Sequence, residues 1–172
     1  MMNVQLRPRW GLAEQEAGRL SAPFSAPPIP VHEIAEQSGV NVVFADFGKH
    51  SETVAGFCDF KARRLYVNAK DPSVRQSFTI AHELGHWVLH RDEFLRDPSK
   101  YPVLPRFAEP NQDDPFEKEA NKFAACLLVP SRLLAPVKGA PVAKLAEIFG
   151  VSRTMMEFRV GRISQKRKAR RW

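Results

Sequence analysis

The chain has 172 residues, 44% of them hydrophobic, which is enough for one packed core and a small additional segment. No apolar run approaches the roughly 18 residues of a membrane span, and residues 1–9 lack the hydrophobic stretch of a signal peptide, so we expect a cytoplasmic protein without membrane contact. The net charge of +7 is uneven: residues 1–130 carry 15 basic and 17 acidic side chains, and residues 131–172 carry 11 and 2. This asymmetry favours a nucleic-acid or acidic partner for the C-terminal segment, with a solvated basic tail as the alternative.

The N-terminal part is expected to be a helix followed by an extended strap. Residues 1–20 have the pattern of a short amphipathic helix, and residues 21–30 are rich in proline, which excludes a helix there. Residues 31–37 then form a helix that ends at Gly39. The two cysteines lie far apart in apolar segments, which predicts buried free thiols rather than a disulfide.

Three short strands are predicted next, at residues 40–47, 54–60 and 65–68, where β-branched and aromatic residues are dense. The short turn at residues 61–63 suggests that they form a meander.

Two helices follow the strands. The first starts at residues 71–73, where Pro72 is acceptable in a first turn and Gln76 stands in capping-box spacing to Ser73, and is expected to end near His90. Residues 91–113 are polar and interrupted by proline, which predicts a loop over a cleft or a partly disordered flap. The second helix covers residues 116–128 and is stopped by Pro130.

The most informative motif is His82-Glu83-Leu84-Gly85-His86, of the form HExxH. Residues four apart lie on one face of a helix, about 6 Å from each other, so both imidazoles can reach one ion. Zinc hydrolases combine two such histidines with a third ligand, a position for water and a carboxylate base. The motif predicts one Zn²⁺ per chain on His82 and His86, with Glu83 as the base that activates the zinc-bound water. The alternative is a buried helix that carries two histidines by chance.

His90 continues the series at the same spacing, but it cannot bind the same ion, because it lies about 12 Å from His82 along the helix. We expect it to support the site from the helix end, and a solvated histidine near the helix C-terminus is an equal alternative.

The third ligand is expected on the helix at residues 116–128, which offers Glu117 and Glu119. Glu117 shares one face with Asn121, four residues on, so Glu117 could bind zinc while Asn121 orients a ligand. Glu119 lies about 200° away around the helix, off that face, so Glu117 is the expected ligand and Glu119 the second choice. A solvated helix face is the alternative for both glutamates. Tyr66, Tyr101 and His90 are candidates for stabilising the oxyanion.

Residues 78–90 and 117–130, together with the strand at residues 65–68, resemble the ImmA/IrrE family of metallopeptidases. The resemblance covers roughly residues 28–132 and implies a compact gluzincin-like fold with zinc on His82, His86 and Glu117 and with Glu83 as general base. Better-known members cleave a helix-turn-helix repressor, so the resemblance implies a repressor protein as substrate. Some members also carry a helix-turn-helix segment after the peptidase.

The C-terminal segment has helix-turn-helix spacing. Residues 142–149 predict one helix, Gly150 a turn, and Ser152 the N-cap of a second helix that runs to about Ile163. The candidates for contacting nucleic acid are Arg153, Arg159, Arg162, Lys166, Arg167 and Lys168. A helical hairpin that only supports the peptidase is the alternative.

Together these patterns predict an α+β fold in which a small three-stranded sheet packs on the HExxH helix and on the glutamate-bearing helix. The expected division is residues 1–30 for the N-terminal helix and strap, 31–135 for the zinc metallopeptidase, and 136–172 for the basic segment. The leading functional hypothesis is a zinc endopeptidase that cleaves a helix-turn-helix repressor. The alternative is a DNA- or protein-binding regulator, or an antitoxin-like partner, that uses the same fold without proteolysis.

Overall fold

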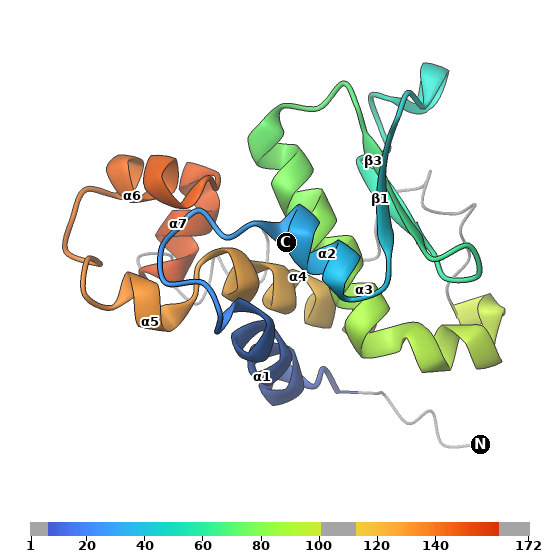
Figure 1. Ribbon diagram of the computed structural model, residues 1–172, viewed down its shortest axis with the longest axis horizontal. Coiled ribbons are helices and arrows are strands. Elements are labelled where there is room, and N and C mark those ends of the chain that lie inside the picture. Colours follow the sequence, from blue (N-terminus) through green and yellow to red (C-terminus); the bar gives the residue numbers. More distant parts are fainter. Residues whose placement is uncertain (1–6, 101–112, 162–172) are drawn as a thin grey trace.

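The computed structural model describes residues 7–100 and 113–161 and has an α+β fold (Figure 1). The helices are α1 (Trp10–Ser21), α2 (Val31–Gln37), α3 (Ser73–Arg96), α4 (Pro115–Leu128), α5 (Ser131–Leu134), α6 (Val142–Phe149) and α7 (Arg153–Arg159). The strands are β1 (Asn41–Ala45), β2 (Gly56–Asp59) and β3 (Arg64–Asn68), and the short 3-10 turns are Gly48–His50 and Pro98–Lys100. Each predicted helix and strand has a counterpart here.

The sheet has the order β1-β3-β2, with β1 parallel and β2 antiparallel to the central β3. The predicted meander is therefore wrong. A meander needs each strand to pair with the next, but residues 46–55 between β1 and β2 are long enough to bypass the central position, which β3 then fills. The turn at residues 61–63 does join two paired neighbours, β2 and β3.

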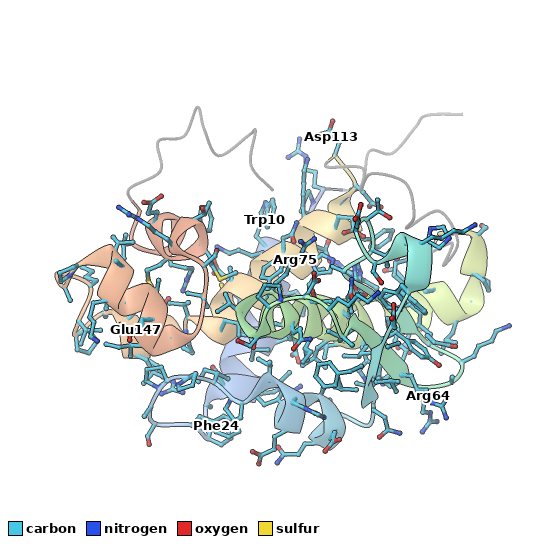
Figure 2. All side chains as sticks on the ribbon, turned by 90° about the horizontal axis from the view of Figure 1, so that it is seen from above. Trp10, Phe24, Arg64, Arg75, Asp113 and Glu147 are labelled. Atoms are coloured by element: carbon cyan, nitrogen blue, oxygen red, sulfur yellow. The ribbon has the colours of Figure 1, made fainter. Side chains whose placement is uncertain are left out.

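One face of the sheet packs on α3. Leu65 and Val67 of β3 and Cys58 of β2 are fully buried on this face, whereas Tyr66 points to the other face and stacks on Phe57 with ring centroids 4.8 Å apart. Cys58 and Cys126 are both buried free thiols, as predicted. The core then continues through α3 and α4 as far as α1 and α7 (Figure 2).

Helix α3 is longer than predicted, because it ends at Arg96 rather than near His90. Its apolar face continues past His90: Phe94 is buried against Phe60 and Phe116, at centroid distances of 5.3 and 5.0 Å. The predicted capping box is absent. Pro72 occupies the N-cap without a side-chain cap, and Gln76 instead donates to the backbone oxygen of Asn68 at 3.0 Å.

Helices α3 and α4 touch at a glycine. A Cβ atom at Gly85 would lie 3.0 Å from a ring carbon of Phe123 and 3.2 Å from Cα of Ala120. Such a close approach needs a residue without a side chain at this point. The contact brings the HExxH turn of α3 directly against the first turns of α4.

The C-terminal helices α6 and α7 agree with the prediction in most respects. Gly150 takes a left-handed conformation with φ of 65° after α6, and the Ser152 side chain caps α7 by accepting from the backbone of Met155. Helix α7 ends at Arg159, however, and not near Ile163. Gly161 has a φ of 76°, outside the right-handed helical region.

Candidate metal centre

The two motif histidines lie one turn apart on α3 and converge. Their Nε2 atoms are 3.2 Å apart, and the His86 side chain is fully buried, while that of His82 is 13% exposed. Adjacent donors at this distance are expected where both rings face one ion.

Helix α4 brings Glu117 to the same point. One carboxylate oxygen lies 3.1 Å from Nε2 of His82 and the other 3.2 Å from Nε2 of His86. Bonds of about 2.0–2.1 Å in a tetrahedral site place neighbouring ligand atoms about 3.3 Å apart. The three donor groups, two imidazoles and one carboxylate, therefore fit a divalent ion such as zinc in both chemistry and spacing.

The electrostatics of Glu117 suit a ligand that must be ionised. Burial raises the pKa of this carboxyl, but the charge and hydrogen-bond interactions with His86 and His82 outweigh burial, so the pKa lies well below its ordinary value. These interactions involve protons on the imidazole nitrogens that face Glu117, so they describe the centre without an ion. A bound cation would replace those protons and would itself favour the ionised carboxylate.

Glu83 follows His82 directly on α3 and is 2% exposed. Its side chain is therefore buried on the helix that carries both histidines, one residue after His82. The role of base that the motif predicts for Glu83 needs a carboxylate close to the ion but not bound to it.

Asn121 lies where the helical spacing placed it, four residues after Glu117. Its side-chain oxygen is 2.9 Å from Nδ1 of His82. An amide oxygen only accepts hydrogen bonds, so it selects the tautomer of His82 with a proton on Nδ1 and a lone pair on Nε2. The structure thus supplies the orienting contact that the sequence suggested.

His90 is fully buried, which excludes the solvated alternative. Its Nδ1 lies 3.0 Å from Nδ1 of His86, and its Nε2 lies 3.0 Å from a carboxylate oxygen of Glu119. Burial lowers the pKa of His90, partly opposed by Glu119, which favours the neutral ring.

The alternative of a solvated helix face is excluded for Glu119. The residue is 2% exposed, and its carboxylate receives the backbone N–H of Arg9 at 2.8 Å and the Arg9 guanidinium at 2.9–3.2 Å. Although burial raises its pKa, the hydrogen bonds from His90 and Arg9 lower it to about 2. The sequence position does lie away from Glu117, as expected, but α4 is buried on that side as well, by α1 and the segment before it.

Tyr66 does not join the cluster. Tyr66 lies on the sheet face opposite α3, and its hydroxyl accepts a long hydrogen bond of 3.5 Å from Arg64, so it is not a candidate for the oxyanion. Tyr101 lies outside the described residues. His90 is fully buried and its two ring nitrogens contact His86 and Glu119, so its contacts are those of a supporting residue.

Of the predicted nucleic-acid contacts, Arg153 is exposed and pairs with Glu157 at 3.2 Å. Arg159, in contrast to the prediction, uses its side chain within the protein. Its guanidinium donates to the backbone oxygen of Val129 at 2.8 and 3.1 Å and to the hydroxyl of Ser131 at 3.0 Å, so it holds α7 to the end of α4. Arg162, Lys166, Arg167 and Lys168 lie outside the described residues.

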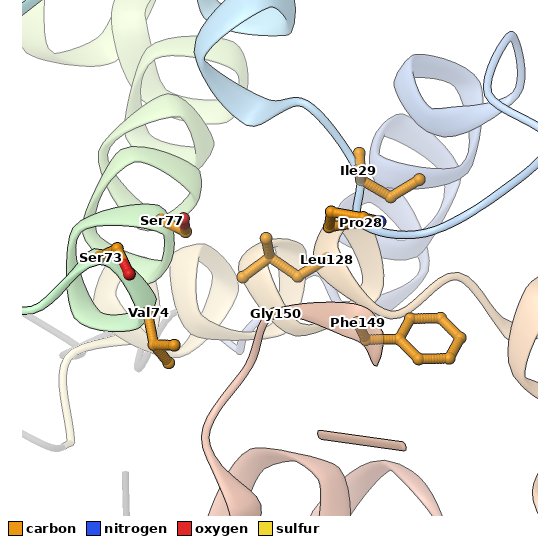
Figure 3. A pocket seen from close by; sticks show the side chains of 8 residues that line it. All are labelled: Pro28, Ile29, Ser73, Val74, Ser77, Leu128, Phe149 and Gly150. Atoms are coloured by element: carbon orange, nitrogen blue, oxygen red, sulfur yellow. The ribbon is translucent and has the colours of Figure 1, made fainter. Parts of the chain in front are cut away.

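A small pocket of about 160 Å³ lies elsewhere, between the first turn of α3, the end of α4, the strap at Pro28 and Ile29, and the α6–α7 turn (Figure 3). None of the cluster residues lines it. Among the described residues, no helix has the length and apolarity to cross a bilayer.

An HExxH helix and a glutamate from the next helix, on a small α+β fold, define the class of metallopeptidase-like domains. The profile of a peptidase family, described as the IrrE N-terminal-like domain, matches residues 35–160, and the chain belongs to this family.

Two further comparisons give a phage relative and a solved structure of the same fold. The chain is 29% identical over 112 residues to a protein of Bacillus phage phi105 named "Uncharacterized immunity region protein 2"; the match covers 62% of this chain and 63%, less than two thirds, of the phage protein. A solved Mycobacterium tuberculosis transcriptional regulator is 18% identical, with a TM-score of 0.62 over 87% of this chain and 46% of its own, and shares the fold.

Proposed function

We propose that this protein is a zinc-dependent endopeptidase acting on a regulatory protein, with a helix-turn-helix transcriptional repressor as the substrate. The observation that carries the proposal is the convergence of three donor groups, His82, His86 and Glu117, within 4.8 Å of one another. The family assignment and the name of the phage relative, an immunity region protein, agree with a role among regulators of mobile elements.

Different side chains of the protein perform different parts of peptide hydrolysis. His82, His86 and Glu117 hold the ion, and Asn121 keeps Nε2 of His82 directed at it. A divalent ion, when bound, supplies Lewis-acid polarisation of the scissile carbonyl and lowers the pKa of water beside it. Glu83 takes a proton from the attacking water on its carboxylate and delivers that proton to the leaving amine nitrogen.

The test is to measure the zinc content of the purified protein and then to incubate it with the repressor encoded beside its gene. We expect one zinc per chain and cleavage of the repressor. Glu83→Gln should retain zinc and lose cleavage by about 10²–10⁴-fold, because the amide cannot accept the proton. Glu147→Gln is the matched control: this glutamate lies on α6, away from the cluster, and pairs only at the surface with Lys144 (Figure 2).

Two results would contradict the proposal. One is that the wild-type protein binds no zinc when zinc is present in excess. The other is repressor cleavage by Glu83→Gln at the wild-type rate, because the proton transfer assigned to this carboxyl would then be unnecessary.

A second candidate function is DNA or protein binding without proteolysis. It is favoured by the turn geometry of α6 and α7 and by the basic surplus of residues 131–172. Salt-dependent binding to duplex DNA that persists after zinc removal, with no cleavage of the repressor, would support this function instead.

A further inference from the structure

A chain of hydrogen-bonding groups runs from the candidate metal centre to the N-terminal segment. It starts at His86, passes to His90 through two Nδ1 atoms 3.0 Å apart, and continues from Nε2 of His90 to Glu119 at 3.0 Å. Arg9 closes it by binding both carboxylate oxygens of Glu119. The two imidazoles are fully buried, and the Glu119 side chain is 3% exposed.

The protons along this series of hydrogen bonds can be placed by starting from the carboxylate of Glu119. The carboxylate of Glu119 can only accept hydrogen bonds, so Nε2 of His90 carries a proton and donates it. The contact between the two Nδ1 atoms holds one proton, and when that proton is on His86, Nδ1 of His90 accepts it through its lone pair. Nε2 of His86 is then left with its lone pair, and this is the atom that faces Glu117 and His82.

We propose that Glu119 and His90 are positioning residues that fix the tautomer and the ring orientation of His86 for metal binding. The proposal rests on the metal site described under Proposed function and adds residues that do not touch the ion. It also extends that site beyond the matched family domain, because Arg9 precedes residue 35. His82 receives the equivalent support from Asn121 in one contact.

A packing role alone does not require this arrangement. Burying a carboxylate and two imidazoles costs free energy that apolar side chains of similar volume avoid, and it is offset only when every polar atom is paired. Here the pairing is directional, since each group dictates which nitrogen of the next carries the proton. Close packing of the ring shapes alone would accept either tautomer of His86. Metal binding requires the tautomer that has its lone pair on Nε2.

The test measures zinc affinity by chelator competition on the full chain, together with the imidazole N–H resonances of the zinc-loaded protein by NMR. His90→Phe and Glu119→Ala should weaken zinc binding by about 10–100-fold. The hydrogen-bonded Nδ1–H resonance of His86 should be visible in the wild type and lost in His90→Phe.

Two conservative variants separate the two hydrogen bonds of His90, one to His86 and one to Glu119. They also provide the test if His90→Phe does not fold. His90→Asn places an amide oxygen near the original Nδ1 and should restore most of the zinc affinity. His90→Gln can reach Glu119 but offers no acceptor near His86, so it should bind zinc as weakly as His90→Phe.

Trp87→Phe is the matched control, because Trp87 lies on the same helix, is 4% exposed and loses one hydrogen bond of 3.0 Å, to Ser38. It should leave zinc affinity unchanged. Wild-type affinity in His90→Phe or His90→Gln, or equal losses in Trp87→Phe, would overturn the positioning role while leaving the zinc site in place. A wild-type protein that binds no zinc would overturn both the site and this role.

Discussion

The helix pairs α3–α4 and α6–α7 differ in what they bury. The buried residues of α3 and α4 include histidines and carboxylates, among them His86, His90, Glu83 and Glu119. The buried residues of α6 and α7 are all hydrophobic, namely Val142, Leu145, Ala146, Phe149 and Met156. Apolar packing is sufficient to hold two helices together, so the polar interior of the first pair needs another explanation.

We attribute the polar interior to the proposed metal centre, because buried ionisable groups are costly unless they are paired, and such groups gather where chemistry requires them. The second pair shows the contrasting case, in which a charged residue serves the fold. Arg159 spans from α7 to the backbone oxygen of Val129, at the end of α4. The difference between the pairs can be tested by substitutions that act on metal binding in one pair and on stability in the other.

The largest expected effect is on metal-dependent stability. Zinc at about 1,000 times its Kd should stabilise the wild type by about 4 kcal/mol, which raises Tm by about 8–16 °C for a chain of this size. Glu117→Gln removes the anionic ligand and should abolish most of that increase, as measured by calorimetry with zinc and with a chelator. Glu147→Gln is the control and should keep the full increase. An equal zinc response in Glu117→Gln would exclude Glu117 as the third ligand.

The next effect concerns the two arginines of α7. Arg159→Ala leaves the carbonyl of the buried residue Val129 without its charged donor, removes the contact to the exposed Ser131 hydroxyl, and should lower the free energy of unfolding by about 1.5–3 kcal/mol. Arg153→Ala removes an exposed pair with Glu157 and should cost less than about 1 kcal/mol. Urea unfolding measures both. Equal losses would show that Arg159 does not anchor α7, and neither variant should change zinc affinity.

The sequence predicted the candidate site better than the sheet. HExxH and the Glu117–Asn121 spacing depend on the geometry of single helices, which local sequence determines, and the structure brings these residues together. Strand order depends on how the connection between β1 and β2 crosses the sheet, which no local pattern encodes.

Glu119 shows a second limit of sequence reasoning. Helical spacing separated it from Glu117 correctly, but its environment depends on Arg9, 110 residues away in the chain. Position on a helix predicts which residues share a face, and it does not predict which faces other segments cover. A useful signal was present nonetheless: Glu119 is followed by a largely apolar run to Leu128, which favours a helix buried on more than one side.

The last comparison is between the stability effects of substitutions at two glycines. Gly150→Ala puts a Cβ atom on a residue with φ of 65° and should cost about 1–2 kcal/mol of stability, with no change in zinc affinity. Gly85→Ala gains up to about 1 kcal/mol in helix propensity and loses about 1–3 kcal/mol to crowding against Phe123 and Ala120, so the net loss is about 1 kcal/mol.

The two glycine variants should differ in zinc affinity, although both lose stability. To relieve the crowding at Gly85, α4 must move away from α3, which separates Glu117 from the two histidines. Gly85→Ala should therefore weaken zinc binding although it touches no ligand, whereas Gly150→Ala should not. Urea unfolding and chelator competition on the same samples provide both quantities. If Gly85→Ala bound zinc like the wild type, the close contact of α3 with α4 would be a requirement of packing alone.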